Sequence, residues 1–334
     1  MKYINIYSII VILCLSCNNK SSNDAKYAFY YWKPTVKLTK NEKHLLTHSS
    51  SIYVRYFDIK WNSKPIPVAK VYFPKSTFKD LIIIPVIYIK NEVFINLSER
   101  EIESLSNKTL ELVDKINKTI GIKNNTEIQI DCDWSDATKS KYFAFLKKLK
   151  IKRSLKVSVT IRLHQIKYYF KTGIPPCDKG VLMFYNMGKL GNFKKNSIYN
   201  TYDASQYVKS IKEYPFSLDV ALPIFRWGYV LRNGEIINLL SKIDDSELKQ
   251  QTFVNIINQQ HFQFLEGKYW RGIYFQKNDE IFIEKISTKE LYQAVNLLSK
   301  HIKRPSNVIF FDLDSTNISH FSHEEFSQIS SFFR

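Results

Sequence analysis

Apolar runs bounded by turn residues alternate along this chain with longer amphipathic stretches. Leu81–Ile89 is almost continuously apolar, which is typical of a strand buried on both faces. Ser98–Ile120 then has the spacing of a long helix, with Ser98 and Glu101 as a capping box and Gly121 as its stop. The pattern therefore predicts strands and helices that follow one another in turn.

About eight stretches read as strands of one sheet: Tyr27–Trp32, Ser51–Trp61, Leu81–Ile89, Ile128–Ile130, Leu155–Leu163, Lys179–Asn186, Phe216–Val230 and Val308–Asp314. Helical patterns occupy most of the gaps: Thr39–Leu46, Ser98–Ile120, Lys139–Lys150, Asp203–Lys212, Thr288–Ile302 and His323–Phe333. Alternation of this kind favours a parallel sheet, and eight strand–helix units close into a ring. The predicted fold is α/β, a (β/α)8 TIM barrel over residues 26–334. No glycine-rich phosphate loop is present, which disfavours a nucleotide-binding fold.

Two segments do not fit the simple alternation. A proline-containing loop after the second strand carries one further strand-like run, Val68–Phe73. Residues 228–285 hold the hairpin turn Asn233-Gly234 and strand-like pieces at Tyr269–Phe275 and Glu280–Ile286. We interpret residues 228–285 as a small α/β insertion after the seventh strand.

The first residues have the features of an export signal. Residues 1–17 combine an early lysine with a short apolar run that is too short to span a bilayer. The run ends at Cys17, before a polar stretch at 18–25, and this end resembles the lipobox of bacterial lipoproteins. We expect a signal peptide over 1–17, lipidation of Cys17, a tether over 18–25, and a bacterial envelope location on the outer membrane, facing the periplasm or the surface. The alternative is a cleaved signal with an incidental cysteine.

Composition narrows the classes of partner. The formal charge is +18 and 15% of the residues are aromatic. Such a charge favours nucleic acid, anionic lipid or acidic polysaccharide. The lysines are scattered rather than gathered in a basic run, so we expect no nucleic acid partner and a monomer.

Metal and disulfide patterns are weak. Beyond the leader, only Cys132 and Cys177 remain, without zinc-ligand spacing, so we expect neither a disulfide framework nor a cofactor. His44 and His48 have a helical i, i+4 spacing, but without a third ligand a solvated helix face is favoured, and no metal is expected.

The chemistry-bearing stretch follows the predicted strand Ile128–Ile130. Asp131 and Asp133 come directly after it, and side chains two apart in a strand point the same way. Asp136 follows before the next helix. Acids at the carboxyl end of a strand are placed where barrels hold their substrates. The plain alternative is that these acids are cap and turn residues.

Four stretches carry a resemblance to a known family, in order along the chain: Asp131-Cys132-Asp133-Trp134-Ser135, Met183-Phe184-Tyr185-Asn186, Ala221-Leu222-Pro223-Ile224-Phe225-Arg226-Trp227 and Ile309-Phe310-Phe311-Asp312-Leu313-Asp314. They resemble the family 18 glycoside hydrolases, the chitinase-like barrels, whose motifs there read Asp-x-Asp-x-Glu, Met-x-Tyr-Asp/Asn, Gly-Leu-Pro-x-Tyr-Gly-Arg-x-Trp and Met-x-Trp-Glu-x-Asp. The resemblance implies an oligosaccharide or polysaccharide partner, such as an N-acetyl amino sugar polymer, and substrate-assisted catalysis. It also assigns Asp133 and Tyr185 to holding the N-acetyl group.

One departure from the family pattern bears on catalysis. Ser135 stands where the family has its proton-donating Glu, and a hydroxyl does not replace a carboxylic acid in that role. Three hypotheses remain open: a glycan hydrolase with a rearranged acid, a barrel that only binds glycan, and a structural envelope protein. The expected catalytic residues are Asp131, Asp133, Asp136 and Tyr185, and the expected substrate contacts are Trp32, Asn186, Arg226, Trp227 and Asp312.

Overall fold

The structure is a computed structural model that describes residues 26–74, 81–122, 125–152, 155–192, 195–302 and 304–333. The expected signal peptide, Cys17 and the tether lie outside these residues. Within them, no helix has the length and apolar character needed to cross a membrane.

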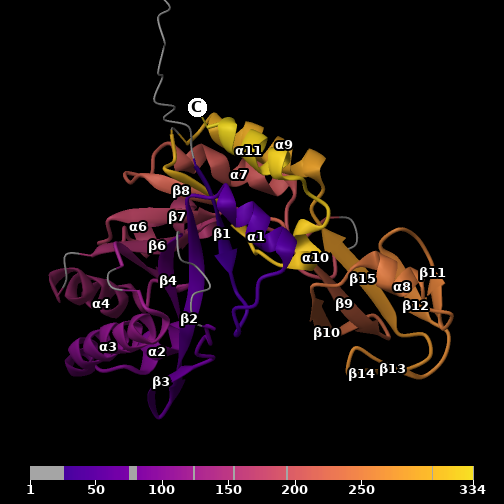
Figure 1. Cartoon of the computed structure of the whole chain (residues 1–334), viewed down its shortest axis with the longest axis horizontal. Coiled ribbons are helices and arrows are strands. Elements are labelled where there is room, and N and C mark those ends of the chain that lie inside the picture. The colour runs from indigo at the N-terminus through magenta and orange to yellow at the C-terminus, as the bar shows by residue number, and fades with distance from the viewer. Residues whose placement is uncertain are drawn as a thin grey trace, which may run out of the picture.

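Eight parallel strands form a closed ring, which confirms the predicted TIM barrel (Figure 1). Their order is β1 (Lys26–Tyr31), β2 (Ser51–Asn62), β4 (Ile82–Ile89), β5 (Glu127–Asp131), β6 (Lys156–Arg162), β7 (Lys179–Met183), β8 (Leu218–Pro223) and β16 (Asn307–Phe311). The ring closes because β1 pairs in parallel with both β16 and β2. All eight carboxyl ends therefore meet at one end of the barrel.

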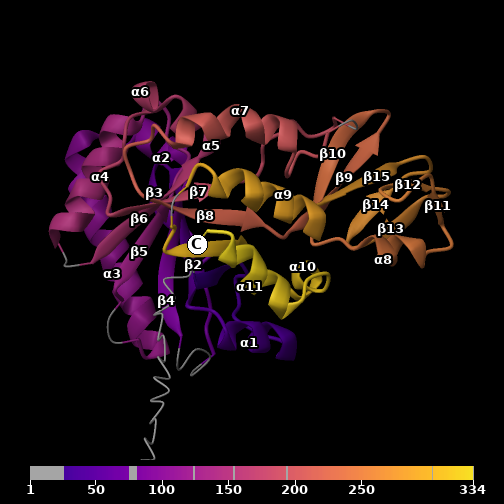
Figure 2. The same cartoon turned by 90° about the horizontal axis from the view of Figure 1, so that it is seen from above.

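Helices cover the outside of the ring (Figures 1 and 2). They are α1 (Lys40–Thr47), α2 (Asn91–Asn96), α3 (Ile102–Ile120), α4 (Lys139–Lys152), α5 (Leu163–Lys167), α6 (Tyr169–Thr172), α7 (Thr201–Ile211), α9 (Thr288–Ser299), α10 (Ser315–Ile318) and α11 (His323–Ser331). A 3-10 turn at Glu99–Glu101 precedes α3, with the predicted capping box at Ser98 and Glu101 and a left-handed Gly121 (φ 82°) at its end. The apolar outward side chains of the strands and the inner faces of these helices form the main core.

The inside of the barrel is built in layers, and β5 contributes one polar side chain to each. Glu127 Oε2 accepts from Lys179 Nζ at 3.0 Å, and Gln129 Oε1 accepts from the hydroxyl of Tyr30 at 2.7 Å. Asp131 follows two residues further on. Because strand side chains alternate, these three residues point into the same interior, and Asp131 reaches the carboxyl end.

The extra strand lies earlier than predicted. β3 (Lys64–Val68) pairs antiparallel with β2, whereas the sequence pattern favoured Val68–Phe73. Pro65 and Pro67 argued against a strand there. β3 pairs with one neighbour only, at the end of the sheet order, and an edge strand tolerates proline because its free side needs no N–H donor.

The seventh barrel strand also ends sooner than its apolar pattern indicated. Phe216–Val230 reads as one strand, but β8 stops at Pro223 and the chain leaves the barrel through Ile224 and Phe225. It then enters a separate five-stranded antiparallel sheet ordered β10-β9-β15-β12-β11, beside the two-stranded pair β13–β14. The bounds are β9 (Arg226–Arg232), β10 (Glu235–Ser241), β11 (Val254–Ile256), β12 (His261–Phe264), β13 (Lys268–Trp270), β14 (Ile273–Phe275) and β15 (Glu280–Lys285).

This insertion lies to one side of the barrel, as Figure 2 shows, and has a small core of its own. The turn Asn233-Gly234 joins β9 to β10 with positive φ at both residues, as the dipeptide predicted. Within the described part of the insertion the one helix is α8 (Asp245–Lys249), so its content is mainly strand.

Candidate glycan site

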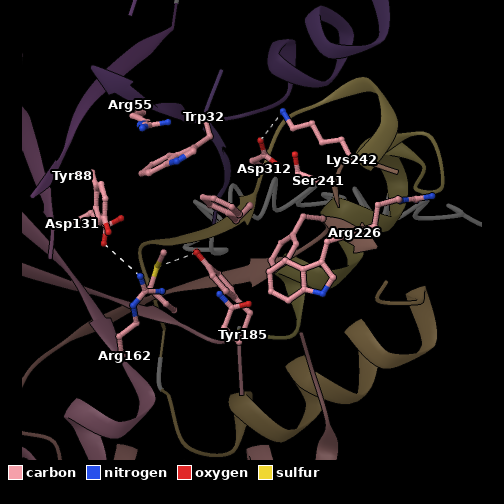
Figure 3. Close-up of a pocket in the computed structure, with 15 residues that line it drawn as sticks. Trp32, Arg55, Tyr88, Asp131, Arg162, Tyr185, Arg226, Ser241, Lys242 and Asp312 are labelled. Atoms are coloured by element: carbon pink, nitrogen blue, oxygen red, sulfur yellow. Dashed lines mark hydrogen bonds and ion pairs between the residues drawn. The ribbon is translucent and has the colours of Figure 1, made fainter. Parts of the chain in front are cut away.

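A cavity of about 460 Å³ opens at the carboxyl end of the barrel (Figure 3). Its walls come from the ends of the barrel strands and from the insertion. The lining residues are Trp32, Arg55, Tyr88, Asp131, Arg162, Met183, Tyr185, Asn186, Phe225, Arg226, Trp227, Ser241, Lys242, Phe311 and Asp312. We call this space the barrel cavity.

Asp131 lies deep in the barrel cavity as the last residue of β5. It is 4% exposed, and its Oδ1 accepts a hydrogen bond from the Thr160 hydroxyl at 2.6 Å. Burial raises the pKa of Asp131, and the nearby Arg162 opposes that rise only in part. The site therefore holds a carboxyl group that favours its protonated form more than a solvated aspartate does.

Arg162 connects Asp131 with Asp133. Its Nη2 lies 3.8 Å from Asp131 Oδ1, and its Nε and Nη2 donate to the two carboxylate oxygens of Asp133. Burial alone would lower the pKa of Arg162, but the two aspartates outweigh burial and raise it. Asp133 is half exposed and does not line the barrel cavity itself. The predicted pairing of Asp131 and Asp133 on one side of the chain is therefore present, with a guanidinium beside both.

Tyr185 and Asn186 follow the end of β7. The hydroxyl of Tyr185 is buried and lies 3.5 Å from the sulfur of Met183, and burial raises the pKa of Tyr185. Asn186 has a left-handed backbone (φ 57°), which asparagine adopts more readily than most residues. That conformation turns the chain out of the strand direction and leaves both side chains at the cavity.

Aromatic side chains line much of the barrel cavity. Trp32 follows β1 and packs against Phe311, with ring centroids 5.4 Å apart. Phe225 continues this row, with its ring 5.8 Å from that of Phe311 and 5.1 Å from that of Trp227, whose indole N–H donates to Glu284 at 2.9 Å. Rings of this kind offer flat apolar faces with fixed orientations.

Asp312 is a second buried carboxyl in the cavity, 3% exposed, at the end of β16. Asn317 Nδ2 donates to it at 2.6 Å, and Lys242 Nζ lies 3.5 Å away. Burial raises the pKa of Asp312 against the opposing charge of Lys242. Lys242 belongs to the insertion, so this contact joins the insertion to the barrel.

Most of the site residues predicted from sequence converge on this cavity. Those that line it are Trp32, Asp131, Tyr185, Asn186, Arg226, Trp227 and Asp312. Arg226 lines the wall with its stem while its guanidinium extends away from the other labelled residues (Figure 3), toward Asp244.

Asp136 is placed elsewhere. Its side chain is 71% exposed and pairs with Lys139 one turn away at 2.6 Å. The chain has left β5 by this point, and the residue faces solvent without lining the cavity. The expectation that Asp136 reaches the cleft is therefore corrected.

Ser135 also lies outside the cavity lining. Its hydroxyl is 3.3 Å from that of Thr138, and Asn91 Nδ2 lies 3.5 Å from it. A residue at this position therefore does not enter the cavity, whereas Asp131, four residues earlier at the end of β5, does.

The sequence did not single out several lining residues. Tyr88 is next to last in β4 and Arg162 is the last residue of β6, and the rule that strand ends face the site could have identified both. Arg55 lies in the middle of the long β2. Ser241 and Lys242 come from the insertion, whose approach to the barrel no local pattern reveals.

The described residues contain no group of three or more His, Cys, Asp or Glu side chains arranged to hold a metal ion. The carboxyl groups of the cavity are instead matched with Arg162 and Lys242. The chemistry available from these side chains is hydrogen bonding, ring stacking and proton transfer.

No protein-family model matches the chain, and no curated protein sequence matches it significantly. Among solved structures, the spore cortex-lytic enzyme SleL of Bacillus cereus superposes with a TM-score of 0.57 at 12% identity, over 93% of this chain and 74% of that one. The Ostrinia furnacalis Group IV chitinase, solved in complex with allosamidin, superposes with a TM-score of 0.52 at 9% identity, over 92% and 98% of the two chains. At such identities the likeness concerns the fold alone, and by fold this chain is a chitinase-like TIM barrel with an insertion after the seventh strand.

Proposed function

We propose that the barrel cavity binds a glycan. The observation that carries this proposal is the lining, where Trp32, Trp227 and Phe311 stand beside buried polar groups such as Asp131 and Tyr185. A pyranose ring needs this combination, because its C–H face stacks on aromatic rings while its hydroxyl groups need hydrogen-bond partners. The cavity volume, about 460 Å³, is also within the usual range for small-ligand sites.

The decisive test is binding of an oligosaccharide panel to the purified chain, measured by calorimetry. Trp32→Ala and Trp227→Ala are each expected to weaken binding by about fivefold or more, since the loss of a stacked ring is worth at least about 1 kcal/mol. Tyr269→Ala serves as the control, because Tyr269 is an exposed aromatic residue in the insertion that does not line the cavity. Failure of the whole panel to bind would remove the proposal.

Hydrolysis of the bound glycan is a second candidate, favoured by the buried carboxyl groups. Burial raises the pKa of Asp131 and of Asp312, and a carboxyl with a raised pKa can donate a proton near neutral pH. Asp133 is the third acid, but both of its oxygens accept hydrogen bonds from Arg162. That ion pair must open before Asp133 can reach a glycosidic oxygen.

Release of reducing ends from each bound glycan tests this candidate. If the chain is a hydrolase, Asp131→Asn lowers kcat by about a hundredfold or more, the usual contribution of general acid–base catalysis. Asp136→Asn keeps full activity, since Asp136 lies outside the cavity. Binding without any release of reducing ends would identify the chain as a binding protein.

We also propose that the chain is a lipoprotein anchored through Cys17 in a bacterial envelope. The support is the short apolar leader and its lipobox-like end. A lipid chain anchors a protein because each buried methylene group contributes about 0.8 kcal/mol. The glycan would then be met at the outer membrane.

A further inference from the structure

The charged side chains that line the barrel cavity differ in their exposure to solvent. The acids Asp131 and Asp312 are at its floor, with side chains 6% and 5% exposed. Three of the lining cations are nearer the solvent: the side chains of Arg55, Arg162 and Lys242 are 22%, 21% and 31% exposed, whereas Arg226 is buried. A ligand that enters the cavity therefore reaches these three cations before Asp131 and Asp312.

Arg55 is held rigidly from behind. Its Nε donates to Asp58 Oδ1 at 2.6 Å and its Nη2 donates to Asp58 Oδ2, while Asp58 itself is only 3% exposed. The guanidinium lies 5.3 Å from the ring centroid of Trp32, and Figure 3 shows the two side by side. Asp58 thus fixes the orientation of Arg55 without lining the cavity.

The other edge of this guanidinium has no hydrogen-bond partner among the residues that the structure describes. Among the described residues, nothing accepts a hydrogen bond from Nη1 of Arg55, and the same is true of Nη1 of Arg162, whose Nε and Nη2 donate to Asp133. Each arginine is therefore oriented by an aspartate on one edge and keeps donors on the other. Along the wall they flank Tyr88 and Asp131, in the order of their strands (Figure 3).

From this arrangement we infer that the glycan is anionic, with a carboxylate or sulfate group on the sugar that Arg55 receives beside Trp32. This inference rests on the proposed glycan-binding function and specifies its substrate class. Hydrogen bonds between a guanidinium and an anionic oxygen are about twice as strong as neutral ones, and a fixed arginine loses little freedom on binding. Lys242 also lines the cavity, but its charge is matched by Asp312 and Asp314, so Arg55 carries this assignment.

The charge of the whole chain acts in the same direction. A formal charge of +18 attracts an acidic polymer over distances beyond direct contact, and added salt weakens that attraction. A neutral polymer gains no affinity from the positive charge of the chain or from the fixed Arg55. Affinity for anionic and neutral oligosaccharides of equal length therefore separates the two substrate classes.

The experiment is calorimetry with three oligosaccharides of equal length: an oligogalacturonate, a sulfated oligosaccharide and a neutral chito-oligosaccharide. The full-length protein is expected to bind at least one anionic oligosaccharide about tenfold tighter than the neutral one at low salt, a ratio that one charge-assisted hydrogen bond supplies. Whichever anion binds tighter identifies the group that the site receives. Raising the salt concentration is expected to reduce this preference.

Arg55→Gln removes the positive charge. It is expected to lower the ratio of affinities for anionic and neutral oligosaccharides about tenfold, while the affinity for the neutral oligosaccharide changes little. Because this change leaves Asp58 without its partner, the double variant Arg55→Gln with Asp58→Asn repeats the test without a buried unpaired charge. Lys268→Gln, an exposed lysine in the insertion, is the matched control.

Two failures are distinguishable. Equal affinity for charged and neutral oligosaccharides, or a preference for the anion that survives in both Arg55 variants, overturns the anionic assignment and leaves glycan binding in place. If none of the oligosaccharides binds, glycan binding itself fails.

Discussion

At the scale of single residues, Asp131 shows how position on a strand determines chemistry. It is the last inward residue of β5, which places a carboxyl group where water is largely excluded. Among the described residues its strong partner is the Thr160 hydroxyl at 2.6 Å, since Arg162 is closer to Asp133 than to Asp131. Ionisation of Asp131 therefore costs stability.

Asp131→Asn is predicted to change how stability depends on pH. The pKa of Asp131 is raised in the folded state, so the folded protein binds this proton more tightly than the unfolded chain does. Stability from this residue is then greatest at acidic pH and falls as the pH rises from the unfolded pKa through the folded one. As the pH rises through this range, the free energy of unfolding of Asp131→Asn, measured with urea, should increase relative to that of the wild type.

The comparison variant is Asp136→Asn. Asp136 is exposed, so its replacement removes no buried charge, and its effect should stay within about 0.5 kcal/mol at each pH. The difference in unfolding free energy between Asp131→Asn and wild type should favour the variant more as the pH rises. A difference that stays constant with pH, or that favours the wild type more as the pH rises, would contradict the cost assigned to the buried charge.

The residues of the site were predictable where strand position or motif fixed them. Asp131, Tyr185 and Asp312 follow apolar runs directly, and all three line the cavity. Arg55 was not predictable, because its role depends on Asp58 behind it and Trp32 beside it. Such relations involve two strands and do not appear in any local pattern.

At the scale of elements, the insertion is attached to the barrel through charged side chains as well as through the chain itself. Lys242 lies 3.1 Å from Asp314 and 3.5 Å from Asp312, and Lys33 holds Asp314 from the barrel side at 3.0 Å. Burial alone would raise the pKa of Asp314, but the two lysines outweigh it and lower the pKa. The lysines therefore stabilise an ionised carboxylate between the two units.

Lys242→Met is predicted to destabilise the protein by about 1–3 kcal/mol near neutral pH, because it leaves buried carboxylates short of a cation. The figure stays modest since Lys242 is itself 31% exposed. The pKa of Asp314 is depressed, so the stability it contributes is present above the unfolded pKa and is lost as the pH falls through the folded pKa. The loss of unfolding free energy caused by Lys242→Met, measured with urea across this pH range, should therefore be smaller at acidic pH.

Lys268→Met provides the reference, because Lys268 pairs only loosely with the exposed Glu266 at 3.9 Å. Its effect should be near zero at every pH. Equal effects for the two lysines would show that the contact between insertion and barrel contributes nothing.

Elements were predicted well wherever local pattern and tertiary structure agreed. The long helix ending at Gly121 and the turn at Asn233-Gly234 carry their own capping and turn residues. The apolar run Phe216–Val230 was misread as one strand, because its residues are buried in two different sheets. The spacing of apolar residues indicates that they are buried, but it does not indicate in which sheet they are buried.

At the scale of the whole molecule, the strand–helix alternation was enough to predict the barrel, because the ring is the arrangement that buries eight such units together. The likeness to chitinase-like folds extends over 92–93% of the chain at 9–12% identity. What the sequence left open was how the insertion contributes to the cavity, since contacts such as that of Lys242 depend on the packing of separate units.

Cys17→Ser is predicted to release the protein from the membrane fraction when the full chain is produced in a bacterial host. Without the lipid, the chain keeps only the short leader region, which is too short to span a bilayer. Fractionation followed by immunoblotting measures the change, and Cys132→Ser, in the buried core, is the control for loss of a thiol. Retention of Cys17→Ser in the membrane would argue for a different form of attachment.

The parallel sense of the strands has a consequence for orientation. Every barrel strand begins at one pole and ends at the cavity mouth, and β1, the first of them, starts at Lys26 on the far pole and leads to Trp32 at the mouth. If Cys17 carries a lipid as proposed, the attachment precedes Lys26 by nine residues, and Lys26 lies on the pole opposite the mouth. An acylated Cys17 would point the cavity outward from the lipid surface, toward polymers arriving from the surrounding medium.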